Sequence, residues 1–259
     1  IQLGILETIV EICRENDLKC YPVGGTLLGA VRHKGFIPWD DDVDVALPRE
    51  DFDRLETICR KELPEHYKWI DYKDEFRIPG NLAKVCDTRT VLIQETRADY
   101  EVPLGVYMDI FPLDGMPRNP VLQELHHFRA QCLRMLICIN SLDTSRPRPL
   151  IKRLIIGLVQ GIVSESSVRS MQESLERTIR KYSYDSAQEV CNYLGRYGRR
   201  ERFPKAWVGE RTTVTFEGLE MTAFSEYPKY LGRIYGDYLT LPPPEHRKPH
   251  DEYRVSMAE

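Results

Sequence analysis

Two spacings of apolar residues along this chain predict two kinds of secondary structure. Over residues 1–17, isoleucines such as Ile5 and Ile9 recur at helical spacing, which predicts an amphipathic helix. Over residues 42–47, charged and apolar residues alternate with a period of two, which is typical of a strand that Pro48 should end. The N-terminal part of the chain is therefore expected to mix helices with strands.

The rest of the chain alternates between β-rich and helical stretches. Residues 20–31 are interpreted as a strand, a glycine turn and a helix, and residues 52–59 as another helix. A β-rich run over residues 106–111 is expected to stop at Pro112. The other predictions are β-rich runs over residues 67–72, 82–85 and 90–93, helices over 121–136, 150–163 and 168–179, a hairpin over 213–222 with its turn at Glu217-Gly218, and a helix over 227–235.

The order of these elements divides the chain into three sections. Residues 1–118 are predicted to form an α/β core around a mixed sheet, and residues 119–200 a helical section. Residues 201–259 are predicted to form a small β-hairpin, a helix and a tail that pack back on the core. The fold class expected from this order is α/β in the broad sense, an α+β arrangement with a helical insertion.

Composition and charge exclude several classes of protein. The 259 residues are 42% apolar and 29% charged, as in an ordinary globular domain, and the formal net charge of −4 argues against a general nucleic-acid-binding protein. No apolar run approaches the roughly 20 residues that a membrane-spanning helix needs. No signal peptide is visible, and seven scattered cysteines favour a reducing compartment, so a cytoplasmic location is expected.

Two aspartates on a predicted strand are the first candidates for chemistry. Asp42 and Asp44 are two residues apart, so on a strand their side chains leave the same face. Paired carboxylates repel each other, and Mg²⁺ or Mn²⁺ is the natural cation for such oxygen ligands. The alternative is a solvated edge strand whose charges discourage aggregation, although Asp40 and Asp41 add more charge than such a strand needs.

A glycine turn and a third aspartate strengthen the metal hypothesis. Gly24, Gly25 and Thr26 lie between a predicted strand and a helix, where backbone N–H groups at the helix start can bind phosphate. Asp109 lies in an apolar strand, where an isolated carboxylate is costly unless it binds something. The alternatives are a turn without a ligand, and a salt bridge or strand-end cap at Asp109. Together, these features predict the phosphate site and the metal site that phosphoryl transfer from a nucleotide requires.

Two adjacent segments resemble a known family. Residues 24–33 read GGTLLGAVRH, and residues 38–44 read PWDDDVD. This combination resembles the LicD family of phosphotransferases, which includes bacterial phosphocholine transferases and is related to the eukaryotic fukutin-related ribitol-phosphate transferases. Further similarity lies in MDIFPLD at residues 108–114, FEG at 216–218, YGDY at 235–238 and LPP at 241–243.

The resemblance implies a nucleotidyltransferase-like core, a CDP-linked donor and a divalent metal. The favoured reaction moves phosphocholine from CDP-choline to a sugar hydroxyl of a teichoic acid or another surface-glycan precursor, and releases CMP. One or two Mg²⁺ or Mn²⁺ ions would be held by Asp42, Asp44 and Asp109, which are also the catalytic candidates. The donor-binding candidates are Gly24, Gly25, Thr26, Lys84, Arg247 and His250.

Three other functions stay open. CDP-ribitol or CDP-glycerol would make the chain a polyol-phosphate transferase, and a nucleotide sugar would make it a glycosyltransferase with an Asp-x-Asp metal site. A glycosyltransferase needs neither the glycine turn nor Asp109, and an inactive binding module would not keep all three carboxylates.

Single residues also have two interpretations each. Lys84 either reaches the donor phosphates or is a surface lysine. For a choline donor, Trp39, Tyr107 and Phe111 are either aromatic faces for the quaternary ammonium or core residues.

One predicted helix has the composition of a membrane-surface helix. Residues 150–163 combine an apolar run with Lys152 and Arg153, and Arg146 and Arg148 precede them. Such a helix can lie on the inner face of a membrane and bring the protein to a lipid-linked acceptor. The alternative is a helix that packs against its neighbours.

Overall fold

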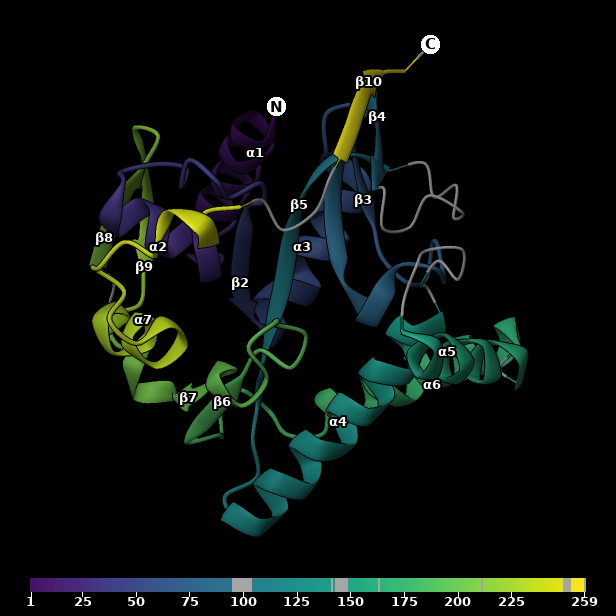
Figure 1. The fold of residues 1–259 in the computed structure, drawn as a ribbon. Coiled ribbons are helices and arrows are strands. Elements are labelled where there is room, and N and C mark those ends of the chain that lie inside the picture. The colour runs from purple at the N-terminus through teal and green to yellow at the C-terminus, as the bar shows by residue number, and fades with distance from the viewer. Residues whose placement is uncertain are drawn as a thin grey trace.

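A mixed β-sheet forms the centre of the computed structural model, and its main path runs β1-β2-β5-β4-β10 (Figure 1). The parallel pair β2–β5 lies in the middle, and the other pairs along the path are antiparallel. The bounds are β1 Tyr21–Pro22, β2 Asp44–Pro48, β5 Leu104–Gly115, β4 Ala83–Gln94 and β10 Tyr253–Met257. The structure describes residues 1–94, 104–140, 142, 149–162, 164–210, 212–248 and 253–258.

Further short strands pair with β4 and β5. β3 (Tyr67–Ile70) pairs with β4, while β6 (Glu189–Cys191) pairs with β5 and with β7 (Arg202–Pro204). The mixed α/β class that the sequence predicts is therefore confirmed. The division of the chain at residues 118 and 200 stays a prediction.

A separate hairpin forms where the sequence predicts it. β8 (Thr212–Phe216) and β9 (Leu219–Ala223) are joined by Glu217 and Gly218, whose φ angles are 50° and 84°. Positive φ at both turn residues is what a two-residue hairpin turn needs if its twist is to match the strands. The FEG motif is thus the turn of this hairpin.

The helices surround the sheet in groups. Figure 1 shows α2 and α7 beside the β8–β9 hairpin, and α4, α5 and α6 gathered on the other side of the molecule. The apolar stripe of α1 is buried, as its spacing predicts, and α7 coincides with the predicted segment. The bounds are α1 Gln2–Glu15, α2 Gly24–Arg32, α3 Arg49–Glu62, α4 Pro120–Asn140, α5 Leu150–Ile162, α6 Glu165–Ile179 and α7 Tyr227–Tyr235.

Two strands in the N-terminal half differ from the sequence prediction. β2 begins at Asp44, so Asp42 lies in the preceding loop instead of on the strand. The predicted runs over residues 82–85 and 90–93 belong to one strand, β4, whose register against β5 shifts partway along its length. The interruption that the sequence shows there is an irregularity within the strand and does not end it.

Pro112 does not end β5, contrary to the sequence prediction. Pairing with β4 stops at Ile110, so that edge of β5 needs no N–H group from Pro112, while pairing with β2 continues opposite Leu47. Residues 253–257, for which no strand is predicted from the sequence, form β10 against β4. In the part of the chain that the structure describes, no helix is both long enough and apolar enough to cross a membrane.

Candidate active site

Three neighbouring strands place charged side chains in a row across the sheet. Asp44 on β2 pairs in register with Asp109 on β5, and Asp109 pairs in register with Lys84 on β4. Residues directly opposite each other on paired strands have their side chains on the same face. The structure therefore brings together two of the three predicted metal ligands, which are far apart in the sequence.

Lys84, at one end of this row, is buried and does not lie on the surface. Its side chain is buried, and Nζ donates a hydrogen bond of 2.5 Å to Oδ1 of Asp109. The same ammonium lies 3.5 Å from the centroid of the Tyr107 ring. The surface-lysine alternative is thus wrong, and the positive charge of Lys84 is bound to Asp109.

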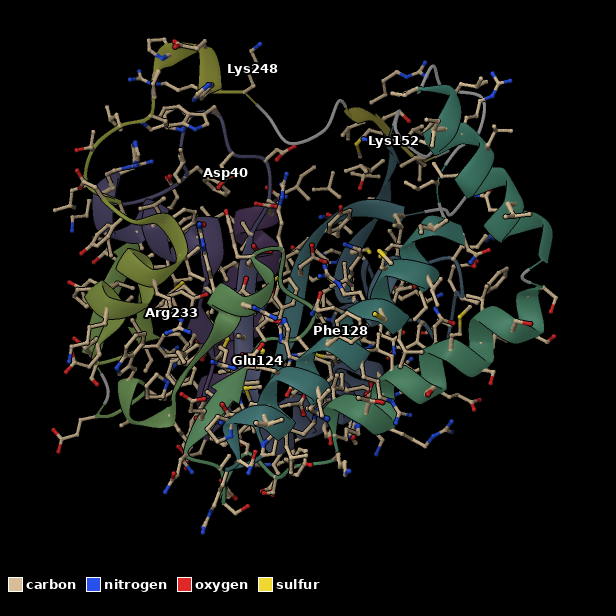
Figure 2. The ribbon with its side chains drawn as sticks, turned by 60° about the horizontal axis from the view of Figure 1, so that its bottom comes forward. Asp40, Glu124, Phe128, Lys152, Arg233 and Lys248 are labelled. Carbon is tan, nitrogen blue, oxygen red and sulfur yellow. The ribbon has the colours of Figure 1, made fainter. Side chains whose placement is uncertain are left out.

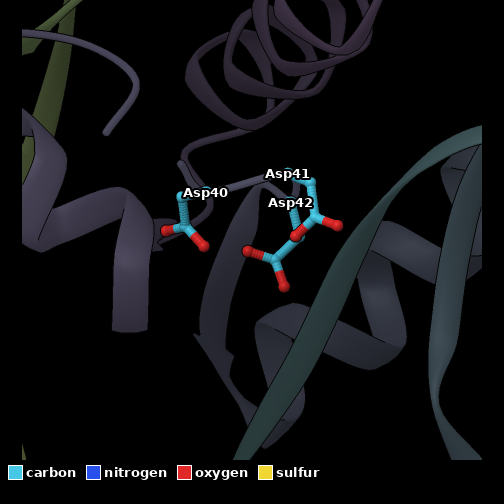
Figure 3. Close-up of side chains that lie close together, drawn as sticks. All are labelled: Asp40, Asp41 and Asp42. Atoms are coloured by element: carbon cyan, nitrogen blue, oxygen red, sulfur yellow. The ribbon is translucent and has the colours of Figure 1, made fainter. Parts of the chain in front are cut away.

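Asp42 belongs to a loop of three consecutive aspartates beside the row. Carboxylate oxygens of Asp40, Asp41 and Asp42 lie within 4.8 Å of one another, and Figure 3 shows the carboxylates of Asp40 and Asp42 facing each other. Both oxygens of Asp41 are buried and lack a hydrogen-bond partner among the described residues. Buried anionic oxygens without donors are stabilised by a cation. The loop therefore adds Asp40 and Asp41 to the predicted ligands.

The cluster holds more negative charge than its surroundings stabilise. Burial raises the pKa of Asp44 well above its ordinary value, and the neighbouring carboxylates of Asp42 and Asp109 raise it further. Burial and the charge of Asp41 also raise the pKa of Asp40. A divalent cation would relieve this repulsion, and carboxylate oxygens are the ligands that Mg²⁺ and Mn²⁺ prefer. The residues present therefore fit such an ion.

The two glycines let the first turn of α2 approach the acidic loop. A Cβ on Gly25 would collide with the carboxylate of Asp40, and Gly24 has a φ of 54°, a conformation that favours glycine. Thr26 is buried, and its hydroxyl accepts a hydrogen bond of 2.8 Å from the backbone N–H of Asp44. The glycine segment thus positions the carboxylates, and the helix begins at Gly24, earlier than predicted.

A cavity of about 670 Å³ lies over the carboxylates. This volume is in the range of sites for small molecules and cofactors. Trp39 and Phe111, two of the three aromatic residues that the sequence analysis singles out, also line the cavity, whereas Tyr107 packs under Lys84. The predicted site residues that line the cavity are Gly24, Gly25, Asp42, Asp44 and Asp109.

Two arginines lie close to the same indole ring. The guanidinium carbons of Arg32 and Arg247 are 5.9 Å and 5.3 Å from the centroid of Trp39. Arg32 donates hydrogen bonds to the carbonyl oxygen of Tyr238, at 3.1 Å, and to Nδ1 of His33, at 3.4 Å. Arg247 donates one to the carbonyl oxygen of Pro242, at 2.8 Å. Burial lowers the pKa of Arg32, and the charge of Arg247 lowers it further. Two cations that repel each other beside a cavity form a suitable site for an anion.

The last donor-binding candidate, His250, lies outside the described residues. His246 and Lys248, from the same C-terminal segment, line the cavity instead, together with Arg196. The sequence analysis does not identify these residues. The proline-rich run over residues 241–244 precedes His246 and Lys248, and Pro244–His246 form a single 3₁₀ turn.

A group of tyrosines in the cavity is only partly marked in the sequence, because the YGDY motif contains Tyr235 and Tyr238 but not the other two. Tyr197, Tyr230, Tyr235 and Tyr238 line the cavity, and the rings of Tyr197 and Tyr235 meet edge to face with their centroids 5.2 Å apart. These residues come from a turn, from α7 and from the segment after it. Because only tertiary structure brings these elements together, no local spacing marks the group.

Glu201 is a buried acid that faces this cavity. It accepts a hydrogen bond of 3.4 Å from the backbone N–H of Tyr197 and one of 3.5 Å from the hydroxyl of Tyr230. A Cβ on Gly195 would collide with its carboxylate. Burial raises the pKa of Glu201 to about 7. The group therefore titrates near neutral pH.

Replacing Glu201 with glutamine is expected to change how stability depends on pH. Since the folded-state pKa of about 7 lies above the ordinary value of 4.5, folding favours the protonated group, and this contribution is lost as the pH rises through 7. The variant should be more stable than the wild type at pH 8, by on the order of 3 kcal/mol, and about equally stable at pH 4. Urea unfolding at both pH values measures the free energy of unfolding of each protein. If variant and wild type differed by the same amount at pH 4 and pH 8, the prediction would be contradicted.

The β8–β9 hairpin fixes the loop that leads to the aspartates. Oε1 of Glu217 accepts a hydrogen bond of 3.0 Å from the backbone N–H of Phe36, and the backbone N–H of Glu217 donates 2.8 Å to the carbonyl of Lys34. A Cβ on Gly35 would collide with the Glu217 carboxylate. The FEG motif therefore positions the acidic loop from the far end of the chain.

The glycines and carboxylates of the site lie in a region that matches a known protein family. Residues 17–114, which contain the glycines and all the carboxylates of the cluster, match the family described as LicD/FKTN/FKRP, nucleotidyltransferase domain. Uncharacterised proteins of Rickettsia prowazekii and Rickettsia typhi are 38% identical over 109 residues and 41% identical over 110 residues. Each match covers 42% of this chain, and they cover 37% and 33% of those proteins.

A longer match covers nearly the whole chain. The lipopolysaccharide cholinephosphotransferase LicD of Haemophilus influenzae is 31% identical over 253 residues, which are 96% of this chain and 92% of that protein. The match to the nucleotidyltransferase domain agrees with the mixed sheet and confirms the expected class of core. Because the similarity extends from the acidic cluster through the tail, this chain belongs to the LicD family.

Proposed function

We propose that this chain is a metal-dependent transferase that moves phosphocholine from CDP-choline to a hydroxyl group of a surface-glycan precursor. The observation that carries the proposal is the in-register pair of Asp44 and Asp109, which lines one cavity together with Asp42. Such carboxylates fit the divalent cation that phosphoryl transfer from a nucleotide uses. The printed activity of the Haemophilus relative supports phosphocholine as the transferred group.

The proposed reaction forms one phosphorus–oxygen bond and breaks another. The acceptor hydroxyl oxygen bonds to the phosphorus that carries choline, the bond from this phosphorus to the bridging oxygen of the diphosphate breaks, and CMP leaves with the electron pair. The hydroxyl proton passes to a carboxylate. Asp109, or another carboxylate near it, is the proposed acceptor of the proton, and Oδ1 of Asp109 accepts a hydrogen bond from Lys84.

In this proposal, the acidic residues and the arginines contact different parts of the donor. Asp42, Asp44 and Asp109 would hold Mg²⁺ or Mn²⁺, which would neutralise charge on the donor diphosphate. Arg32 and Arg247 bind phosphate oxygens through charge-assisted hydrogen bonds. The indole of Trp39 lines the cavity and offers an aromatic surface on which the cytosine base can stack.

The aromatic lining supports choline over a polyol. A quaternary ammonium cannot donate hydrogen bonds and is bound on aromatic faces, whereas ribitol and glycerol need hydrogen-bonding partners. Tyr197, Tyr235 and Phe111 line the same cavity as the carboxylates. The headgroup of CDP-choline is therefore proposed to lie against these rings.

A donor panel tests the proposed function. The purified chain is incubated with Mg²⁺ and with CDP-choline, CDP-ribitol, CDP-glycerol or a UDP-sugar, with lipopolysaccharide or teichoic acid as the acceptor, and release of the nucleotide is measured. We expect acceptor-dependent CMP release from CDP-choline that EDTA abolishes and Mg²⁺ or Mn²⁺ restores. The preferred acceptor distinguishes the two glycan classes.

Other outcomes of the panel would select the alternative functions. Turnover of CDP-ribitol or CDP-glycerol in preference to CDP-choline would make the chain a polyol-phosphate transferase. Turnover of the UDP-sugar would make it a glycosyltransferase. Binding of CMP without turnover of any donor would contradict the transferase proposal and favour a binding module.

A further inference from the structure

The helix α4 exposes an apolar face to the solvent and buries a mainly polar face. A helix on the surface of a globular domain normally turns its apolar stripe toward the core. In α4, four exposed residues fall on one stripe, because Val121, Leu125, Phe128 and Met135 follow helical spacing and are 56% to 67% exposed. The buried face consists mainly of polar or small residues, Gln123, His126, His127, Ala130 and Ile137.

Polar contacts fix the rotation of α4 about its own axis. Nε2 of Gln123 donates a hydrogen bond of 2.8 Å to the carbonyl of Pro117, and Nε2 of Gln131 donates one of 3.0 Å to the carbonyl of Tyr193. The ring of His126 packs edge to face on Tyr193 at a centroid distance of 5.4 Å. Turning the apolar stripe inward would leave these buried polar groups without partners. The exposed stripe is therefore built into the fold.

Basic residues border this stripe, and its acid is neutralised. Arg118 and Arg129 are exposed at its start and along its edge. Glu124 is the acid of α4, and it forms ion pairs with Arg199 at 3.0 Å and Arg202 at 2.9 Å. Figure 2 looks onto this region, with Phe128 and Glu124 labelled on the helix. The local charge is positive although the net charge of the whole chain is −4.

The helix α5 repeats this pattern beside α4. Nε2 of Gln160 donates 3.0 Å to the carbonyl of Ile139, which ties the two helices together. Lys152 and Arg153 are exposed, and residues 150–162 contain no acid. From the sequence, this helix fits either a membrane surface or packing against its neighbours, and the structure leaves apolar side chains uncovered at Leu150, Ile151, Leu154 and Leu158.

We propose that the α4 stripe, with α5 beside it, docks on the surface of an anionic phospholipid bilayer. Apolar side chains bordered by Arg and Lys bind such a surface by entering the headgroup region while the cations pair with lipid phosphates. A second copy of the chain would bring the arginines of two identical stripes together, and like charges at an interface are unfavourable. The docking is separate from the chemistry in the cavity, because no residue of the stripe lines it.

Vesicle flotation of the full chain tests this proposal. The wild type should float with vesicles of phosphatidylcholine and phosphatidylglycerol, and bind pure phosphatidylcholine at least about tenfold more weakly. L125S/F128S should reduce binding to the anionic vesicles by at least about tenfold. V255S/M257S is the matched control, because it removes two apolar side chains of similar exposure from β10, and it should bind like the wild type.

A charge variant and a solution measurement complete the test. R118E/R129E should lose binding to anionic vesicles, while the melting temperature and donor turnover with a water-soluble acceptor stay at wild-type values, since both arginines are exposed and outside the cavity. Wild-type levels of flotation in L125S/F128S would overturn the proposal. So would a wild-type dimer in light scattering that becomes a monomer in that variant, because a second copy would then cover the stripe.

Discussion

Replacing Asp44 with asparagine is expected to lower phosphocholine transfer by at least about 10³-fold while making the metal-free protein more stable. Asp44 is paired in register with Asp109, and burial and the surrounding carboxylates raise its pKa well above the ordinary value. Its negative charge therefore costs folding energy that a bound cation would offset. Asparagine removes the charge and keeps the backbone N–H that donates to Thr26. CMP release and thermal unfolding, each with and without Mg²⁺, measure the two effects.

The control for this experiment is an exposed acid outside the cavity. Asp185→Asn removes one negative charge from the surface and should leave both transfer and the Mg²⁺-dependent rise in melting temperature unchanged. The Asp44→Asn variant should lose most of that rise. If it keeps wild-type turnover, or gains as much stability from Mg²⁺ as the wild type, Asp44 is not a metal ligand. The same measurements on Asp42→Ala test the second predicted ligand.

Replacing Lys84 with methionine is expected to destabilise the protein by about 3–5 kcal/mol. Lys84 and Asp109 form a buried ion pair at 2.5 Å, and removing the cation leaves a buried carboxylate beside Asp44 without its partner. The thioether of methionine can still pack against the Tyr107 ring, so the loss reports mainly on charge. Urea unfolding of the metal-free protein gives the free energy directly.

A double variant separates the ion pair from packing. K84M/D109L replaces both charges with apolar groups and should recover most of the lost stability, because an apolar pair of similar size often replaces a buried ion pair at little cost. It should remain inactive, since Asp109 is a proposed metal ligand. A loss below about 1 kcal/mol in Lys84→Met would show that solvent or another group compensates Asp109.

Elements whose pattern is local could be predicted from the sequence. The helix Tyr227–Tyr235 and the hairpin turn at Glu217 and Gly218 match the prediction, because helical spacing and turn residues act within a few positions. β10 could not be predicted, because a five-residue strand is stabilised by its partner β4, which lies far away in the sequence. The prediction that β5 ends at Pro112 was wrong for a similar reason, because whether a proline ends a strand depends on which edge of that strand is paired.

The residues of the candidate site also fall into those that can be predicted from the sequence and those that cannot. Asp109 could be identified because a carboxylate in an apolar strand is costly without a partner, and its neighbour Asp44 stood out by alternation. The identity of that partner, Lys84, depends on the register between β4 and β5. Glu201 and the tyrosines of the cavity come from segments that meet only in the folded chain. A sequence motif therefore marks the carboxylate side of the cavity, and tertiary structure is needed for the rest.

The position of Trp39 has an optical consequence. Of the three tryptophans in the chain, Trp39 lies near two guanidinium groups in the cavity, while Trp69 is buried and Trp207 is stacked on Phe203. A nucleotide that enters the cavity changes the polarity around one indole and leaves the other two in place. Replacing Trp69 and Trp207 with phenylalanine would isolate its emission, so donor binding can be followed by intrinsic fluorescence without any label.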